Sequence, residues 1–295
     1  MNQSTNTQTN GTGPDRVGMV VPSSRPYVLG HTRNEQRRLD DQGQLFRPAT
    51  DRLLRKAGIG AGQRVLDVGC GTGSVTSLAA ELVGPSGCVV GIDRSPEVLA
   101  TAREHTAALD LQQASFAEAD LATFATEDPF DAVIGRFVLV HQPNPVATLR
   151  HLADLVRPGG VLAFAESICL LHVLASPRLR LLDQLLTWVL AALRAAGVPT
   201  DLGVRMFDVF VEAGLPEPEV RLEPLTGIGD DPLLASYAVE TARTLMPVME
   251  RFGIATAADV ELDTLEARVH QELLGSGLHC GVILGTAWSR VRLAR

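Results

Sequence analysis

Short apolar runs alternate with helical segments along the chain from residue 61 onward. The runs lack the polar alternation of a strand with one face in water, which is typical of strands buried on both faces of a parallel sheet. Ser95 followed by Pro96 is a typical helix start, because serine caps the helix and proline fits its first turn. Right-handed crossovers then predict a doubly wound, Rossmann-like α/β sheet. The five expected strands are residues 65–68, 88–92, a run around Phe116, 130–134 and 161–165.

A helical segment is expected before this core. The capping-box spacing of Thr32 and Glu35 predicts a helix that runs toward Phe46. Pro48 is expected to restart this helix, and Gly58 to end the pair.

Leucine-rich patterns with intervals of three and four residues predict three more helices after the fifth strand. We expect Pro247 to kink or end the second of them. Two later strands would bring the mostly parallel sheet to seven strands. The expected helices are residues 179–193, 231–245 and 262–273, and the expected strands are 219–222 and 281–288.

The composition excludes several classes of function. Among 295 residues, 34 acidic and 26 basic side chains give a formal net charge of -8, which argues against broad, charge-driven binding to nucleic acid. No apolar run reaches the roughly 18 residues of a membrane span, and the polar start of the chain lacks the pattern of a secretory signal. Four scattered cysteines suggest neither a disulfide framework nor a metal site. We therefore expect a cytoplasmic monomer or homodimer without a membrane, nucleic-acid or metal partner.

The most informative segment follows the first expected strand and reads Val-Leu-Asp-Val-Gly-Cys-Gly-Thr-Gly over residues 65–73. Its glycines let the backbone turn tightly and approach a ligand that a side chain would obstruct. The loop leads into a helix N-terminus, where free N–H groups favour negative ligand groups. Asp93 ends the second expected strand and is placed to accept hydrogen bonds from ribose hydroxyls.

Two cofactors compete for this loop. A dinucleotide fingerprint, Gly-x-Gly-x-x-Gly, needs glycine at position 74, where this chain has Ser74. Asp67, two residues before Gly69, would repel a pyrophosphate but suits a cationic amino-acid group. S-adenosylmethionine carries a ribose, an adenine and a methionyl ammonium, and no phosphate. The charge pattern therefore favours S-adenosylmethionine over NAD.

Five segments in order carry a family resemblance: 65–76, Ile92-Asp93, Ala119-Asp120-Leu121, Phe130-Asp131 and Arg157-Pro158-Gly159-Gly160. Together they resemble the class I S-adenosylmethionine-dependent methyltransferases of small-molecule type. The similarity covers about residues 45–167, and the rest more loosely. The general pattern resembles bacterial methyltransferases that act on natural products, with quinone methyltransferases as relatives.

The resemblance implies a role for each matching residue. Asp67 would contact the methionyl ammonium, Asp93 the ribose and Asp120 the adenine amine. Each aspartate could instead cap a turn or serve as an ordinary loop acid, and Tyr27, in a segment that resembles a cover over the cofactor, could simply pack. The residues expected around the cofactor are Tyr27, Asp67, Gly69, Cys70, Gly71, Gly73, Asp93, Arg94, Ala119, Asp120, Leu121, Arg136 and Phe137.

The resemblance also divides the chain into four parts. Residues 1–25 are expected from their polar composition to be a disordered tail, and residues 26–60 would form a helical segment that covers the cofactor. Residues 61–167 would form the cofactor-binding core. Residues 168–295 would complete the sheet and insert helices over the acceptor.

Methyl transfer from a sulfonium depends mainly on holding nucleophile, methyl carbon and sulfur in line. A base is needed only where the acceptor loses a proton as it reacts. The candidates near the carboxyl ends of the fourth and fifth strands are His141, Glu166 and His172. His141 could instead be structural, and Glu166 could orient His141 or cap a helix.

The acceptor class follows partly by elimination. The stretch 135–138 lacks the Asn-Pro-Pro-Tyr type of signature by which DNA amino-methyltransferases resemble one another, and no Pro-Cys nucleophile appears. The inserted leucine-rich helices can enclose an apolar pocket for a hydrophobic small molecule, although such stripes are also core. Candidate pocket residues are Trp188, Met206, Phe207, Phe210 and Tyr237.

We expect a methyltransferase of secondary metabolism that acts on oxygen of a hydrophobic small molecule. Methylation of carbon or nitrogen, a non-methylating cofactor-binding protein or cyclase on the same fold, and an NAD-dependent reductase stay as alternatives.

Overall fold

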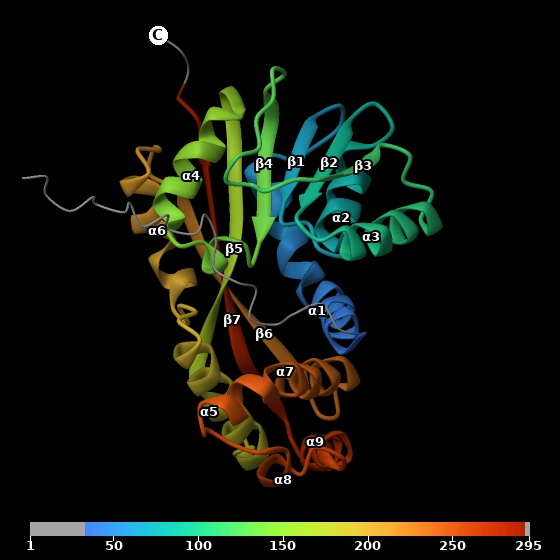
Figure 1. The fold of residues 1–295 in the computed structure, drawn as a ribbon, viewed down its shortest axis with the longest axis vertical. Coiled ribbons are helices and arrows are strands. Elements are labelled where there is room, and N and C mark those ends of the chain that lie inside the picture. The colour runs from blue at the N-terminus through green and yellow to red at the C-terminus, as the bar shows by residue number, and fades with distance from the viewer. Residues whose placement is uncertain (1–32, 293–295) are drawn as a thin grey trace, which may run out of the picture.

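The computed structural model describes residues 33–292, apart from the side chains of residues 33–37 and 170–172. Within this range the strands form one seven-stranded sheet in the order β3-β2-β1-β4-β5-β7-β6 (Figure 1). Strands β1 to β5 are parallel, and β7 is antiparallel to both β5 and β6. This confirms the predicted doubly wound, mostly parallel sheet. The strands are β1 Arg64–Val68, β2 Cys88–Asp93, β3 Ala114–Glu118, β4 Phe130–Arg136, β5 Val156–Ala175, β6 Glu219–Ile228 and β7 Leu278–Arg290.

Helices cover both faces of the sheet. Because successive side chains of a strand point to opposite faces, Val65 and Leu66 of β1 enter different cores. Val65 packs in a core with residues of α1 and α2, whereas Leu66 packs with residues of α4 and α6. The helices of this layer are α1 Arg33–Ala57, α2 Ser74–Val83, α3 Pro96–Ala108, α4 Pro145–Asp154 and α6 Leu202–Glu212, with a 3-10 turn η1 Leu139–His141 after β4.

The long strands β5, β6 and β7 extend beyond this layer and carry a second group of helices at their far end (Figure 1). Leu182, Leu245, Val260 and Val269 belong to its apolar cluster, which joins all four of these helices. We call α5, α7, α8 and α9 the cap. The cap helices are α5 Arg180–Ala195, α7 Pro232–Arg251, α8 Ala257–Val260 and α9 Leu265–Leu274.

Two helix predictions need correction. Neither Pro48 nor Pro247 ends its helix: α1 and α7 both run through their proline. A proline removes one backbone donor, and both prolines are exposed, so water can reach the freed carbonyl groups. Phe46 and Ala49, on either side of Pro48, are both buried, and this packing holds α1 in one piece. The capping residue Thr32 lies outside the described residues.

The sequence also missed parts of the structure. The fifth strand continues past Ala165 to Ala175, because it pairs with β7, a segment distant in the chain, up to Cys169 and again at Leu174 and Ala175. Helices α4 and α6 were not predicted individually. Leu202, Met206 and Phe210 of α6 have helical spacing and are buried, so the sequence pattern that predicts a helix was present.

None of the described helices combines the length and the apolar character that a membrane span requires.

Candidate active site

The glycine loop joins β1 to α2 at the carboxyl edge of the sheet. Gly69 and Gly71 adopt φ values of +61° and +53°, in the left-handed region that favours glycine. A Cβ on Gly69 would stand 2.9 Å from the side chain of Val138, whereas a Cβ on Gly71 would point into open space. Gly69 therefore allows close packing and Gly71 leaves room beside the loop.

Asp93, at the end of β2, holds this loop in place. Its carboxylate accepts hydrogen bonds from the backbone N–H of Gly71 and of Ser95, both at 3.1 Å. The Cys70 N–H donates to Ile92 O at 3.0 Å. Burial raises the pKa of the Cys70 thiol well above its usual value, so this sulfur stays protonated and unreactive at neutral pH.

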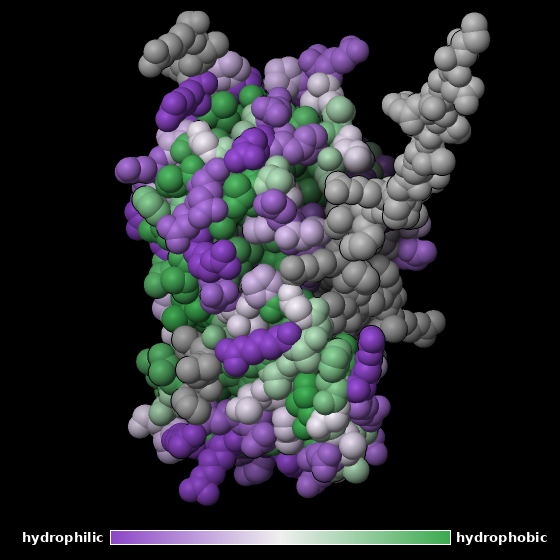
Figure 2. All heavy atoms as spheres, turned by 60° about the vertical axis from the view of Figure 1, so that its left-hand side comes forward, coloured by the Kyte–Doolittle hydropathy of each residue, from purple (hydrophilic) through white to green (hydrophobic). Residues whose placement is uncertain are grey.

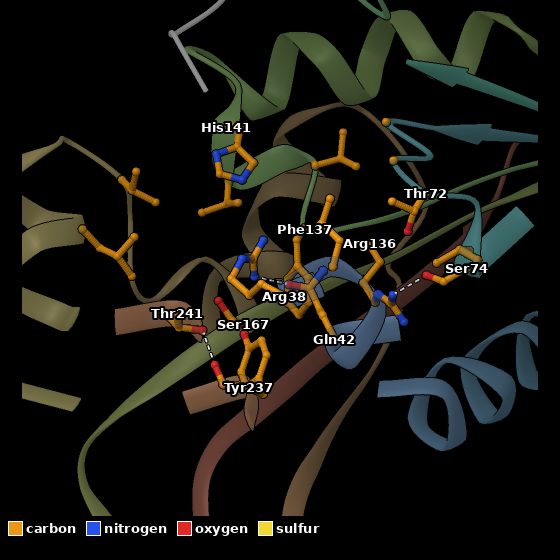
Figure 3. Close-up of a pocket in the computed structure, with 18 of the residues that line it drawn as sticks. Arg38, Gln42, Thr72, Ser74, Arg136, Phe137, His141, Ser167, Tyr237 and Thr241 are labelled. Atoms are coloured by element: carbon orange, nitrogen blue, oxygen red, sulfur yellow. Dashed lines mark hydrogen bonds between the residues drawn. The ribbon is translucent and has the colours of Figure 1, made fainter. Parts of the chain in front are cut away.

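Asp67 and Arg136 are two buried residues beside the loop that bear opposite charges when both are ionised and are close enough for those charges to interact. Asp67 is 1% exposed, and its Oδ2 accepts a hydrogen bond of 2.6 Å from Thr76 Oγ1. Burial raises the pKa of Asp67 to about 7, although the Thr76 hydrogen bond and the Arg136 charge oppose this rise. Arg136 donates to Thr50 Oγ1 at 3.0 Å and to Ser74 Oγ at 2.8 Å (Figure 3). Burial lowers the pKa of Arg136 to about 10, so it stays charged.

These residues border a cavity of about 750 Å³. Its first part, which we call the glycine-loop half, has walls from the loop, the ends of β2 and β4, and Ala119 and Leu121 after β3. Its second part, the apolar half, lies against the cap. The apolar half is lined mainly by Val173, Leu182, Leu185, Leu186, Val189, Leu193, Val198, Leu234, Tyr237, Ala238 and Leu245.

Most of the predicted cofactor residues lie together in the glycine-loop half. Asp67, Gly69, Cys70, Gly71, Asp93, Arg94, Ala119, Leu121, Arg136 and Phe137 all line the cavity. Gly73 and Asp120 lie behind the wall. Gly73 packs against Ala102, and Asp120 Oδ1 accepts the N–H of Ala122 at 2.9 Å, as the loop-acid alternative expects. Tyr27 lies outside the described residues.

The candidate bases are separated by the fold. His141 lines the cavity at the end of η1, and burial lowers its pKa to about 4, with the charges of Arg38 and Arg94 adding to the effect. Glu166 is fully buried outside the cavity wall, and its Oε1 accepts the N–H groups of Val138 at 3.0 Å and Leu139 at 2.8 Å. Glu166 thus caps the turn that carries His141, which is the alternative the sequence left open. The side chain of His172 lies outside the described part of β5.

The expected pocket residues are mostly placed elsewhere. Tyr237 lines the cavity, whereas Trp188 packs beside the cap cluster. Met206 and Phe210 are fully buried in the core, and Phe207 is 42% exposed. The reason is that α6 packs on the sheet, where Phe210 meets Phe164, and not on the cavity. In Figure 2 the molecule is turned so that the left-hand side of Figure 1, where α6 lies, comes forward. Hydrophobic and hydrophilic residues are mixed on the face shown.

The sequence missed Arg38, Gln42 and Ser167 as wall residues, and it assigned the α5 leucines chiefly to the core. The i, i+4 spacing of Arg38 and Gln42 is the signal that puts them on one face of a helix.

Among residues 33–292 we find no group of three or more His, Cys, Asp or Glu side chains that could hold a metal ion.

Comparisons with known proteins find similarity to methyltransferases. A family model described as a methyltransferase domain matches residues 59–189. Aklanonic acid methyltransferase of Streptomyces sp. strain C5 is 35% identical over 127 residues, which are 42% of this chain and 57% of that protein. Trans-aconitate 2-methyltransferase of Methylobacterium nodulans is 38% identical over 117 residues, or 40% and 43% of the two chains. Demethylmenaquinone methyltransferase of Staphylococcus aureus is 32% identical over 117 residues, or 39% and 48%. The chain spans about half the length of these relatives.

Solved structures share the fold. Phosphoethanolamine N-methyltransferase 2 of Haemonchus contortus, in complex with S-adenosyl-L-methionine, superimposes with a TM-score of 0.52 at 17% identity, over 84% of this chain and 53% of that one. The [4+2]-cyclase SpnF gives a TM-score of 0.50 at 20% identity, over 84% and 82%. The glycine loop, the sheet order and the matched domain confirm the resemblance seen in the sequence: residues 59–189 form a methyltransferase domain similar to those of the class I S-adenosylmethionine-dependent enzymes.

Proposed function

We propose that this chain transfers the methyl group of S-adenosylmethionine to a hydrophobic small molecule, with oxygen as the acceptor atom. The observation that carries the proposal is one cavity that runs from the glycine loop into the apolar half beside the cap. A donor in the first half and an acceptor in the second would share one enclosed space, which is what an in-line displacement needs.

The residues of the glycine-loop half fit a cationic nucleoside without phosphate. Gly71 leaves open space beside the loop, and the carboxylates of Asp67 and Asp93 are among the side chains that line this half. When bound, S-adenosylmethionine supplies an electrophilic methyl group on a sulfonium sulfur. We assign Asp93 to the ribose hydroxyls, Asp67 to the methionyl ammonium and Arg136 to the methionyl carboxylate, because these charges complement one another.

The chain's own contribution to catalysis would be positioning. His141 is neutral at pH 7, since its pKa is lowered to about 4, and so low a basicity makes it a weak general base. Glu166 is turned toward η1 and does not line the cavity. An acceptor that is already ionised when it enters needs neither residue as a base. Two of the relatives are named for acids, and the nucleophilic atoms of a carboxylate are oxygens.

Two measurements test the proposal. Isothermal titration should give binding of S-adenosylhomocysteine and none of NADH, and binding of NADH alone would overturn the assignment. A metabolite pool incubated with the protein and isotopically labelled S-adenosylmethionine should then yield a product carrying the labelled methyl group. A rearranged product of unchanged composition would instead favour the non-methylating alternative on the same fold.

A further inference from the structure

Two cap helices line the apolar half of the cavity along most of their length. On each helix the lining residues recur at intervals of three and four, so they form one stripe of its surface. From first to last residue, each stripe covers eleven steps of its helix, or about 16 Å. We call the space between the two stripes the α5–α7 slot. The stripes are Leu182, Leu185, Leu186, Val189 and Leu193 of α5, and Leu234, Tyr237, Ala238, Thr241 and Leu245 of α7.

Hydrogen bonds to β5 show in which direction α5 runs along the cavity. The N–H of Cys169 donates to O of Thr200, which follows α5 in the chain, at 3.2 Å. The N–H of Val173 donates to the carboxylate of Asp183, in the first turn of α5, at 2.7 Å. Helix α5 therefore runs back along β5, and the start of its stripe lies toward Val173.

Helix α7 runs in the opposite direction to α5. Its first turn is fixed to α1, because Ser236 Oγ donates to Asp41 at 2.5 Å and the ring of Tyr237 packs 5.7 Å from that of Phe46. Leu245 lies eight residues beyond Tyr237, about 12 Å along the helix, and belongs with Leu182 to the apolar cluster of the cap. The near end of the slot is thus at Tyr237, and its far end is between Leu182 and Leu245.

The wall of the slot is aliphatic and uncharged. None of the described lining residues from α5, α7, β5 or β7 carries a charge at neutral pH, and Tyr237 is the one aromatic residue among them. The hydroxyl of Thr241 donates to O of Tyr237 at 2.7 Å, so its hydrogen is used within the helix (Figure 3). Burial raises the pKa of the Cys169 thiol, which stays neutral. Such a wall favours an aliphatic occupant over a stack of aromatic rings.

We propose that the acceptor carries an extended aliphatic chain of about a dozen carbons, which lies in the α5–α7 slot while the reacting head stays at its near end. Each C–C bond of about 1.5 Å advances an extended chain by about 1.3 Å, so about twelve carbons match the length of the stripes. A compact polycyclic body would leave the far end of the slot empty. This inference rests on the proposed function, because it takes the apolar half as the acceptor site.

A series of 1-alkanols with six to fourteen carbons tests the length of the slot. Equilibrium dialysis of the radiolabelled alcohols measures their affinity for the protein saturated with S-adenosylhomocysteine. We expect the affinity to rise about fourfold with each methylene up to about twelve carbons and then to level off, because further carbons find no more wall. Affinities that stay flat from six carbons, or that still rise at fourteen, would contradict a slot of this length.

Cyclododecanol tests the shape of the slot at a constant number of carbons. Its wide ring has to displace wall side chains, so it should bind about tenfold more weakly than 1-dodecanol. Equal or tighter binding of the ring would overturn the proposal.

A variant then places the chain between the two helices. Leu186 is half-buried and lies seven residues from Leu193, about 10 Å along the stripe. Leu186→Trp should leave 1-hexanol binding within about twofold and move the plateau to about eight carbons, and the smaller change Leu186→Phe should move it less. Gln184→Trp, at an exposed position of the same helix that does not line the cavity, is the control and should keep the wild-type series. An unchanged plateau in both Leu186 variants would show that the chain binds elsewhere.

The two proposals fail in different ways. A wild-type protein that does not bind S-adenosylhomocysteine would count against the proposed function, while the alkanol series without cofactor would still report the length of the slot. A protein that binds S-adenosylhomocysteine but shows no dependence on chain length would count against this inference alone.

Discussion

Asp67 is a carboxyl group whose charge depends on what binds beside it. Its pKa is raised to about 7 because burial removes water from the charged form. A bound ammonium would favour the ionised form, so ligand binding and ionisation of Asp67 are linked.

We therefore predict that affinity for S-adenosylhomocysteine falls as the pH is lowered from 7 to 6. Over this range the free protein increasingly holds a proton on Asp67, while the ligand ammonium keeps its charge. Each unit of pH below 7 should cost up to about tenfold in affinity, and binding should release protons. Isothermal titration in buffers of different ionisation enthalpy measures both effects. Asp67→Asn should bind more weakly at pH 7 and lose the pH dependence; a variant that keeps it would assign the titration to another group.

At the scale of elements, the 3-10 turn η1 depends on a side chain from the next strand. Glu166 of β5 accepts the N–H groups of Val138 and Leu139, and so fixes the start of the turn that presents His141 to the cavity. Burial raises the pKa of Glu166 to about 8, so the carboxyl is mainly protonated at pH 7.

This arrangement predicts different outcomes for two substitutions. Glu166→Gln keeps an oxygen acceptor without a charge, so we expect little loss of stability at pH 7. Glu166→Ala leaves two buried N–H groups without an acceptor and should cost about 3 kcal/mol, measured by urea unfolding. Because the folded pKa lies above the unfolded one, the wild-type protein should lose stability as the pH rises from about 4.5 through 8, and Glu166→Gln should lose less. Equal losses in both variants at pH 7 would contradict the capping role.

At the scale of the whole molecule, the cavity exists because two groups of elements meet. The sheet edge supplies the glycine-loop half, and α1, α5 and α7 close the apolar half. Helix α1 packs against Tyr237 of α7 through Phe46, whose ring lies 5.7 Å from the tyrosine ring. Because different elements line the two halves of the cavity, a substitution in the cap can change the apolar half without changing the glycine-loop half.

Ala238 of α7 lines the cavity, and Ala238→Trp should fill part of its apolar half. We expect acceptor methylation to fall by about a hundredfold, while affinity for S-adenosylhomocysteine stays within about twofold, since the change is confined to the acceptor side. Product formation and calorimetry measure the two effects. Glu250→Trp, at an exposed position near the end of α7, is the control and should change neither. Full activity in Ala238→Trp would show that the acceptor lies elsewhere.

The sequence alone determined the parts of the protein that depend on neighbouring residues. Apolar runs and turn glycines predicted the parallel strands, and Ser95 with Pro96 fixed the start of α3. The glycine loop and Asp93 were found because strand, turn and helix follow one another within about 30 residues, a local unit with its own chemical signature.

Only the tertiary structure decided how distant segments meet. An apolar stripe says which face of a helix is buried, but not against which surface, so α6 took Met206 and Phe210 into the core while α5 gave leucines to the cavity. The length of β5 depends on pairing with β7, and the role of Glu166 on the position of η1. Arg38 became a wall residue because packing kept α1 whole across Pro48 and set it against α7. These outcomes follow from contacts between residues far apart in the chain, which no local pattern encodes.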